Sequence, residues 1–166
     1  AIVFKLKKRV KVTKKIKKED KIMYLDVMTN LKNRNFLNDN LIYWEANKVY
    51  PQTIVIVDLN DISVINDTKG HEEGDAQIVA AAKILISTQR ENSEIVRTNG
   101  NEFLIYLVGY EEKSIATYVN KLMKEFKNLP YNYGASVGYH MITSESTTID
   151  DAINEALKKM RENKEN

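Results

Sequence analysis

Polar side chains that could do chemistry follow two apolar stretches of this chain. Asp58 stands near the end of the run "QTIVIVDL" at residues 52–59. A carboxylate there would be desolvated unless something pairs with it. The stretch "RTNGNEFLIYL" at residues 97–107 places Asn99, Asn101 and Glu102 around a predicted Asn-Gly hairpin turn. Asp58 could cap the next turn, or it could belong to a ligand site, which in α/β sheets commonly lies beyond the carboxyl ends of strands.

The residues after Asp58 favour the ligand site. The segment "DLNDISVINDTKGHEEGD", residues 58–75, is more polar than a plain connection between a strand and a helix needs to be. It contains Asn66 and Asp75, whose amide and carboxylate groups offer donors and acceptors of hydrogen bonds.

The elements that must position these residues alternate between helix and strand. Apolar spacing predicts helices over 35–47, 72–87, 113–128 and 149–162. It predicts strands over 52–59 and 133–142, and a hairpin of 94–98 with 102–108. Asn33 is a predicted N-cap of the first helix, and Thr148 with Asp151 form a predicted capping pair for the last. The fold class that follows is α/β, a mixed central β-sheet flanked by helices.

Composition describes one globular domain with a basic N-terminal arm. The chain has 166 residues, 43% of them hydrophobic and none of them cysteine, so a disulfide framework and a thiolate metal site are excluded. Residues 1–21 hold ten Lys or Arg and two acids, a local charge of 10 − 2 = +8. The remainder holds 25 − 10 = 15 basic and 23 − 2 = 21 acidic residues, a charge of −6, which argues against a nucleic-acid partner.

The arm itself is open to two interpretations. "AIVF" followed by dense lysine is typical of the cytoplasmic end of a transmembrane helix, and a solvated helical linker is the alternative. We expect residues 1–23 to form a basic helical arm that joins a domain at residues 24–166 to an upstream membrane or sensor segment. The expected location is cytoplasmic, as part of a membrane-anchored protein.

Several segments, in order, resemble the GGDEF family of diguanylate cyclase domains. They are "DVMTNLKNR" (26–34), the 58–75 segment, "RTNGNEF" (97–103), "SVGYH" (136–140) and "ALKKMR" (156–161). The family resemblance implies a fold similar to the palm of nucleotide cyclases and polymerases. It also implies the joining of two GTP molecules into cyclic di-GMP, with Mg²⁺ on the triphosphate.

Carried over by position, the resemblance implies roles for individual residues. Asp58 and the Leu59 carbonyl would bind the metal, and Asn66 with Asp75 would read the guanine edge. Glu102 would be the retained acid of the signature hairpin. The implied contacts to the nucleotide come from Asn99, Gly100 and Arg161.

The departures from the family pattern predict a loss of catalysis. The signature G-G-D-E-F reads Asn99-Gly100-Asn101-Glu102-Phe103, so Asn101 replaces a metal-binding acid. An amide is neutral and cannot act as a base, and Mg²⁺ favours carboxylate oxygens. We therefore expect weak Mg²⁺ binding or none. Asn99 replaces a glycine and is expected to tolerate a positive φ in the turn. The family's inhibitory product site, R-x-x-D, is reduced to Arg90 and Ser93 in "RENS".

Three functions remain open from the sequence. The first is a degenerate cyclase domain that binds GTP or cyclic di-GMP as a regulatory module. The second is a homodimerisation or docking module, paired with itself or with another signalling domain, that has lost ligand binding. The third is a weakly active diguanylate cyclase that uses Asp58 and Glu102 alone.

Overall fold

The computed structural model describes residues 21–46 and 49–165. Its helices are α2 (Arg34–Ala46), α3 (Ile62–Lys69), α4 (His71–Ser87), α5 (Glu112–Lys127), the 3₁₀ helix η2 (Pro130–Asn132) and α6 (Ile149–Glu165). Its strands are β1 (Gln52–Leu59), β2 (Ser93–Asn99), β3 (Glu102–Val108) and β4 (Ala135–Ile142). The predicted arm lies outside the described residues except for residues 21–23, so the arm remains a prediction.

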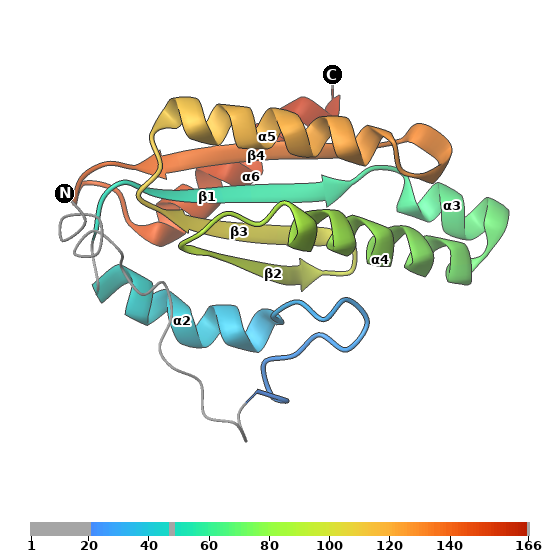
Figure 1. Cartoon of the computed structure of the whole chain (residues 1–166), viewed down its shortest axis with the longest axis horizontal. Helices are drawn as coiled ribbons and strands as arrows, with labels where there is room; N and C mark the ends of the chain where they lie inside the picture. Colours follow the sequence, from blue (N-terminus) through green and yellow to red (C-terminus); the bar gives the residue numbers. More distant parts are fainter. Residues whose placement is uncertain (1–20, 47–48, 166) are drawn as a thin grey trace.

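The strands form a sheet in the order β2-β3-β1-β4 (Figure 1). All pairings between these strands are antiparallel. Within the described part of the chain, the parallel component of the expected mixed sheet is limited to an isolated bridge between Lys32 and Val96. The α/β class, with a central sheet flanked by helices, is confirmed.

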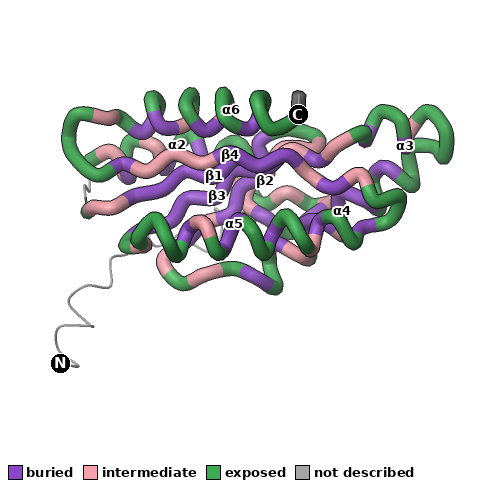
Figure 2. The backbone as a smooth tube through the Cα atoms, turned by 90° about the horizontal axis from the view of Figure 1, so that it is seen from above, coloured by how far each residue is buried: buried purple, intermediate pink, exposed green. Residues whose placement is uncertain are grey.

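Helices cover both faces of the sheet (Figure 2). Along β1, Val55 and Val57 face one apolar core, whereas Ile54 and Ile56 face the other. The first core contains residues of α3, α4 and α5, and the second contains residues of α2 and α6. Because β1 is central and buried on both sides, its sequence is apolar throughout instead of alternating.

Capping side chains mark the starts of two helices, α2 and α6, as predicted. The Phe36 N–H donates to Asn33 Oδ1 at 3.1 Å, so Asn33 caps α2. The Asp151 N–H donates to Thr148 Oγ1 at 3.1 Å, and the Thr148 N–H donates to Asp151 Oδ2 at 3.4 Å. This is the reciprocal pairing of a capping box at the start of α6.

The region after β1 differs from the prediction. Residues 62–69 form the helix α3, which the sequence analysis treated as a polar connection. Ile62 and Ile65 bury its apolar face, while most of its other side chains are exposed or partly exposed. Gly70, with φ 95°, separates α3 from α4 and allows the sharp change of direction between them.

Candidate functional site

The carboxyl end of β1 meets the turn of the β2–β3 hairpin. Asp58 lies opposite Glu102 in the antiparallel register, and the Leu59 N–H donates to the Asn101 carbonyl oxygen at 3.0 Å. Figure 1 shows the end of β1, the hairpin turn and α3 at the same end of the sheet. The fold therefore gathers Asp58, Leu59, Asn101 and Glu102, which were selected from distant parts of the sequence.

The side chain of Asn101 joins the two groups that were expected to hold a metal. Asn101 Nδ2 donates to Asp58 Oδ1 at 2.7 Å and to the Leu59 carbonyl oxygen at 3.1 Å. A cation bound between these oxygens would take the place of that amide group. The replacement of an acid by Asn101 thus adds a hydrogen-bond donor where the family pattern has an acceptor.

The other oxygen of Asp58 has a partner that the sequence analysis missed. Lys164 Nζ donates to Asp58 Oδ2 at 2.8 Å from the last turn of α6. Lys164 lies one helical turn after Arg161, so the two side chains share one face of α6. The step of three residues from Arg161, for which a nucleotide contact was expected, could therefore have pointed to Lys164 from the sequence.

Glu102 is turned toward its own hairpin. Thr98 Oγ1 donates to Glu102 Oε2 at 2.6 Å, and Glu102 is half-buried. It lines a hollow of about 290 Å³ between α2, β3 and α6, together with Asn99, Arg161 and Arg34. Glu102, Asn99 and Arg161, which the family resemblance implied as site residues, therefore meet there. Arg34, the last residue of the segment "DVMTNLKNR" and one for which no role was expected, adds a second cation.

These side chains do not fit a divalent cation. Both oxygens of Asp58 accept hydrogen bonds from protein donors, one of which is an ammonium group. Among the residues that the structure describes, no group of three or more His, Cys, Asp or Glu could hold a metal ion. Mg²⁺ prefers an octahedral shell rich in carboxylate and water oxygens, which this arrangement does not offer.

Asn66 and Asp75 lie on neighbouring helices, α3 and α4. The contact between these helices is close at Gly74, where an added Cβ would lie 1.7 Å from Asn66 Oδ1. Asn66 Oδ1 is buried with no hydrogen-bond partner among the described residues, and Asp75, next to Gly74, is exposed. The structure thus places Asn66 on the helix face that packs against α4, and Asp75 on α4 directly after the contact residue Gly74.

Arg97 holds the hairpin turn in place. Its Nε and Nη2 donate to the Gly100 carbonyl oxygen at 3.0 and 2.8 Å, and its Nη1 pairs with the Asp26 carboxylate at 3.2 Å. The expected positive φ at Asn99 is not found, because Asn99 is the last residue of β2 and pairs with Glu102. A register shift between Arg97 and Asn99 adjusts the strand to the turn instead.

The remnant of the inhibitory site is occupied by contacts within the chain. Arg90 Nη1 donates to the Thr88 carbonyl oxygen at 3.2 Å, and the guanidinium lies 5.1 Å from the centre of the Tyr118 ring. Ser93 is buried, and its hydroxyl donates to the Arg90 carbonyl oxygen. Burial raises the pKa of Tyr118, so its ring stays neutral beneath the arginine. Ser93 therefore supports the turn and does not supply a second recognition group.

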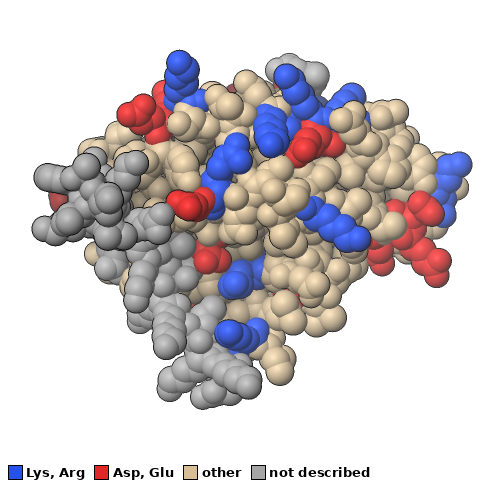
Figure 3. All heavy atoms as spheres, in the orientation of Figure 1, with Lys and Arg blue, Asp and Glu red and all other residues tan. Residues whose placement is uncertain are grey.

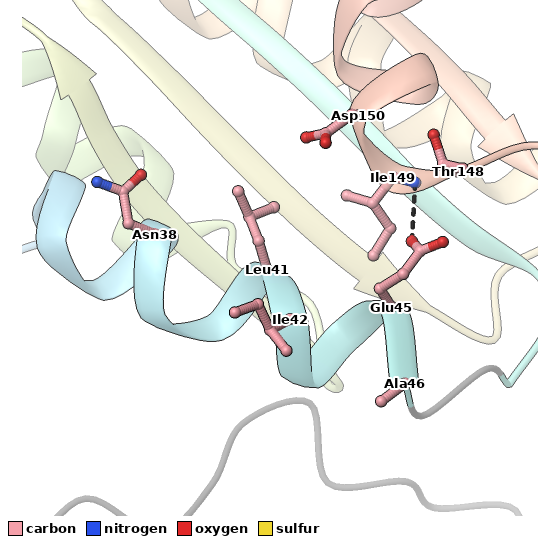
Figure 4. A pocket seen from close by; sticks show the side chains of 8 residues that line it. All are labelled: Asn38, Leu41, Ile42, Glu45, Ala46, Thr148, Ile149 and Asp150. Carbon is pink, nitrogen blue, oxygen red and sulfur yellow. Dashed lines mark hydrogen bonds between the residues drawn. The ribbon is translucent and has the colours of Figure 1, made fainter.

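Another hollow lies between α2 and the start of α6 (Figure 4). It has a volume of about 740 Å³ and is lined by apolar side chains such as Leu41 and Ile42. Glu45 closes one side, where its Oε2 accepts the Ile149 N–H at 2.9 Å. This hollow is a mainly apolar depression of the surface. None of the site residues predicted from the sequence lines it.

Charge on the visible face is mixed. Figure 3 shows Lys and Arg side chains interspersed with Asp and Glu, without a continuous basic track on that face. No helix within residues 21–46 and 49–165 is long and apolar enough to cross a membrane.

Comparisons with known proteins agree with the motifs. The family model described as diguanylate cyclase, GGDEF domain, matches residues 23–166. Diguanylate cyclase DgcP of Escherichia coli is 27% identical over 143 residues, which are 80% of this chain and 42% of that protein. Probable diguanylate cyclase DgcJ of the same organism is 29% identical over 146 residues, 85% of this chain and 29% of that protein. The chain thus spans less than half the length of these curated relatives.

The fold also has close structural counterparts. The coiled coil and GGDEF domain of DgcB from Caulobacter crescentus, solved in complex with c-di-GMP, superposes with a TM-score of 0.78 at 19% identity. The match covers 89% of this chain and 83% of that one. At this identity the likeness concerns the fold alone, whereas the family model covers nearly the whole chain. The chain belongs to the GGDEF family of diguanylate cyclase domains and is a diguanylate cyclase-like domain of cyclic di-GMP signalling.

Proposed function

We propose that this chain is a degenerate GGDEF domain that binds a guanine nucleotide, GTP or cyclic di-GMP, without a metal ion and makes little or no cyclic di-GMP. It would act as a regulatory module in cyclic di-GMP signalling, with the basic N-terminal arm coupling it to an upstream sensor or membrane segment. The observation that carries the proposal is the Asn101 amide, which donates to both Asp58 Oδ1 and the Leu59 carbonyl oxygen.

The loss of synthesis follows from charge. A divalent cation would neutralise the charge that develops on the triphosphate, and removing an acidic ligand weakens that cation's hold. An amide group also cannot accept a proton from an attacking hydroxyl group. Substituting Asn for Asp at the site therefore removes a metal ligand and a candidate base together.

The retention of nucleotide binding rests on different groups. Asn66 packs against Gly74, the residue before Asp75, its Oδ1 has no hydrogen-bond partner among the described residues, and Asp75 is exposed. Arg34 and Arg161, which line the hollow beside Glu102, supply positive charge for phosphate groups. Base recognition and phosphate attraction thus survive without the metal.

Calorimetry with GTP and with cyclic di-GMP, each in the presence of Mg²⁺ and of a chelator, tests the binding. We expect one of the two ligands to bind with the same affinity in both buffers, and the Asn66→Ala/Asp75→Ala variant to lose that binding. A chromatographic assay of GTP conversion in the same samples should detect no cyclic di-GMP. Turnover that requires Mg²⁺ and disappears in Asp58→Ala would overturn the proposal, as would the absence of binding at millimolar ligand.

A docking function without a ligand is the second candidate. It is favoured by the apolar hollow between α2 and α6, at which the side chain of Ile42 is 78% exposed. An Ile42→Asp variant that abolishes the cellular function, while the Asn66→Ala/Asp75→Ala variant retains it, would favour docking to a second copy or another signalling domain.

A further inference from the structure

The Asp58 carboxylate is neutralised by a group that the chain supplies from its far end. Lys164 Nζ lies 2.8 Å from Asp58 Oδ2, and Asn101 Nδ2 lies 2.7 Å from Asp58 Oδ1. The side chain of Asp58 is 19% exposed and that of Lys164 is 39% exposed. The ammonium group therefore reaches a largely buried acid from a partly exposed position.

The packing of α6 on β4 places Lys164 there. Gly138 allows a very close approach, because a Cβ at this position would lie 2.3 Å from Met160 N and 2.4 Å from the Ala156 carbonyl oxygen. Asn163 Nδ2 donates to the Val137 carbonyl oxygen at 2.7 Å and holds the last turn of α6 on the strand. Since β4 pairs directly with β1, the residue after Asn163 can reach across to Asp58.

We infer that Lys164 is a tethered replacement for the divalent cation of this site. Its ammonium group takes the second oxygen of Asp58, while Asn101 takes the first oxygen and the Leu59 carbonyl. Two residues, Asn101 and Lys164, then account for the loss of metal binding, and only Asn101 belongs to the signature motif. Reverting Asn101 to the family's acid leaves the ammonium group in place, so the reverted site still repels a divalent cation.

The charges show why both changes are needed. Asn101→Asp would place a second carboxylate, at residue 101, beside that of Asp58, which the ammonium group of Lys164 already contacts. Neutralising Lys164 as well would leave these two carboxylates without the ammonium group, and hard divalent ions favour carboxylate oxygens. An ordinary surface ion pair contributes only about 0–1 kcal/mol.

The test uses Mn²⁺ alone, because its free ion is counted directly by electron paramagnetic resonance. The variants of the full chain are Asn101→Asp, Asn101→Asp/Lys164→Gln and the charge-conserving control Asn101→Asp/Lys164→Arg. We expect one Mn²⁺ to bind to the Gln double variant at least about tenfold more tightly than to the other two. Lys158→Gln, an exposed lysine of the same helix, is the matched control in the Asn101→Asp background and should change nothing.

Thermal unfolding of each variant, with and without Mn²⁺, is the second measurement. The Gln double variant should gain stability on adding Mn²⁺, since a ligand that binds only the folded state raises its melting temperature. Asn101→Asp binding Mn²⁺ as tightly as the Gln double variant would overturn the role of Lys164. Failure of the Gln double variant to bind or be stabilised would also overturn it. Because no nucleotide is present, neither outcome depends on the proposed guanine-nucleotide binding.

Discussion

Gly138→Ala is the substitution with the most direct structural consequence. The new methyl group would meet three backbone atoms of α6, at 2.3 Å from Met160 N, 2.4 Å from the Ala156 oxygen and 2.9 Å from the Lys159 carbonyl carbon. Because ordinary contacts of a Cβ begin near 3.4 Å, the helix must move away from β4 by roughly 1 Å. Backbone atoms cannot rotate aside as a side chain can, so the whole last part of α6 has to shift.

The expected cost is that of inserting a methyl group into a packed core, about 1–3 kcal/mol. For a domain of this size that corresponds to a fall in melting temperature of roughly 2–12 °C. Circular dichroism during thermal and urea unfolding measures both quantities. Gly100→Ala is the matched control, because nothing lies within 4 Å of a Cβ there and its φ is not positive.

A free energy of unfolding for Gly138→Ala within about 0.5 kcal/mol of the parent chain would refute the reasoning, since that is the range of inconsequential surface changes. Gly138→Ala should also weaken the ion pair of Lys164 with Asp58, because that contact depends on the distance between α6 and the sheet. Because Arg161 of the same helix lines the hollow beside Glu102, nucleotide affinity should also fall in Gly138→Ala, and it should remain unchanged in a destabilised variant of the opposite core, such as Ile115→Val.

Three further outcomes are expected. Gly74→Ala should abolish guanine-nucleotide binding in calorimetry, because the new Cβ displaces the end of the Asn66 side chain. Since that side chain is flexible, the loss in free energy of unfolding should stay below about 1 kcal/mol. Retained affinity would contradict the proposed base contact. Arg97→Lys should lower the free energy of urea unfolding by about 1–3 kcal/mol, because lysine cannot reproduce the forked contacts to the turn and to Asp26; an unchanged unfolding midpoint would contradict this. Burial, and then a neighbouring lysine of α6, lower the pKa of His140, so the folded state binds fewer protons than the unfolded state below about pH 6.5. Stability should thus be complete above about pH 6.5 and fall as the pH drops through the lowered pKa, and a series of urea titrations should show a smaller fall in His140→Gln.

The elements of the fold were predictable to the extent that local signals define them. The apolar run of β1, the Asn33 cap and the pairing of Thr148 with Asp151 depend on residues close together in the chain, and the structure has all three. Helix α3 was missed because few of its eight residues are apolar and its polar side chains are equally typical of a connection. The antiparallel order of the sheet depends on which strands pair, and spacing along the chain does not specify that choice.

The candidate site shows the same division. The residue types at Asp58, Asn101 and Glu102, and the absence of a second signature acid, could be read from the sequence, and they were sufficient to predict a weakened metal site. Where the side chains point could not be read: Glu102 turns to Thr98, and Arg90 lies over Tyr118.

Sequence alone determined the family motifs, the helices and strands with strong periodicity, and the chemical groups available at the signature hairpin. Only the tertiary structure decided that an amide and an ammonium group occupy the two oxygens of Asp58. Asn101, which carries the amide, lies 43 residues after Asp58, and Lys164, which carries the ammonium group, lies 106 residues after it. Contacts at such separations depend on how closely α6 can approach β4 and on the register of β1 with β3. Both are outcomes of packing the entire domain, because no local pattern of residues encodes the distance between two distant side chains.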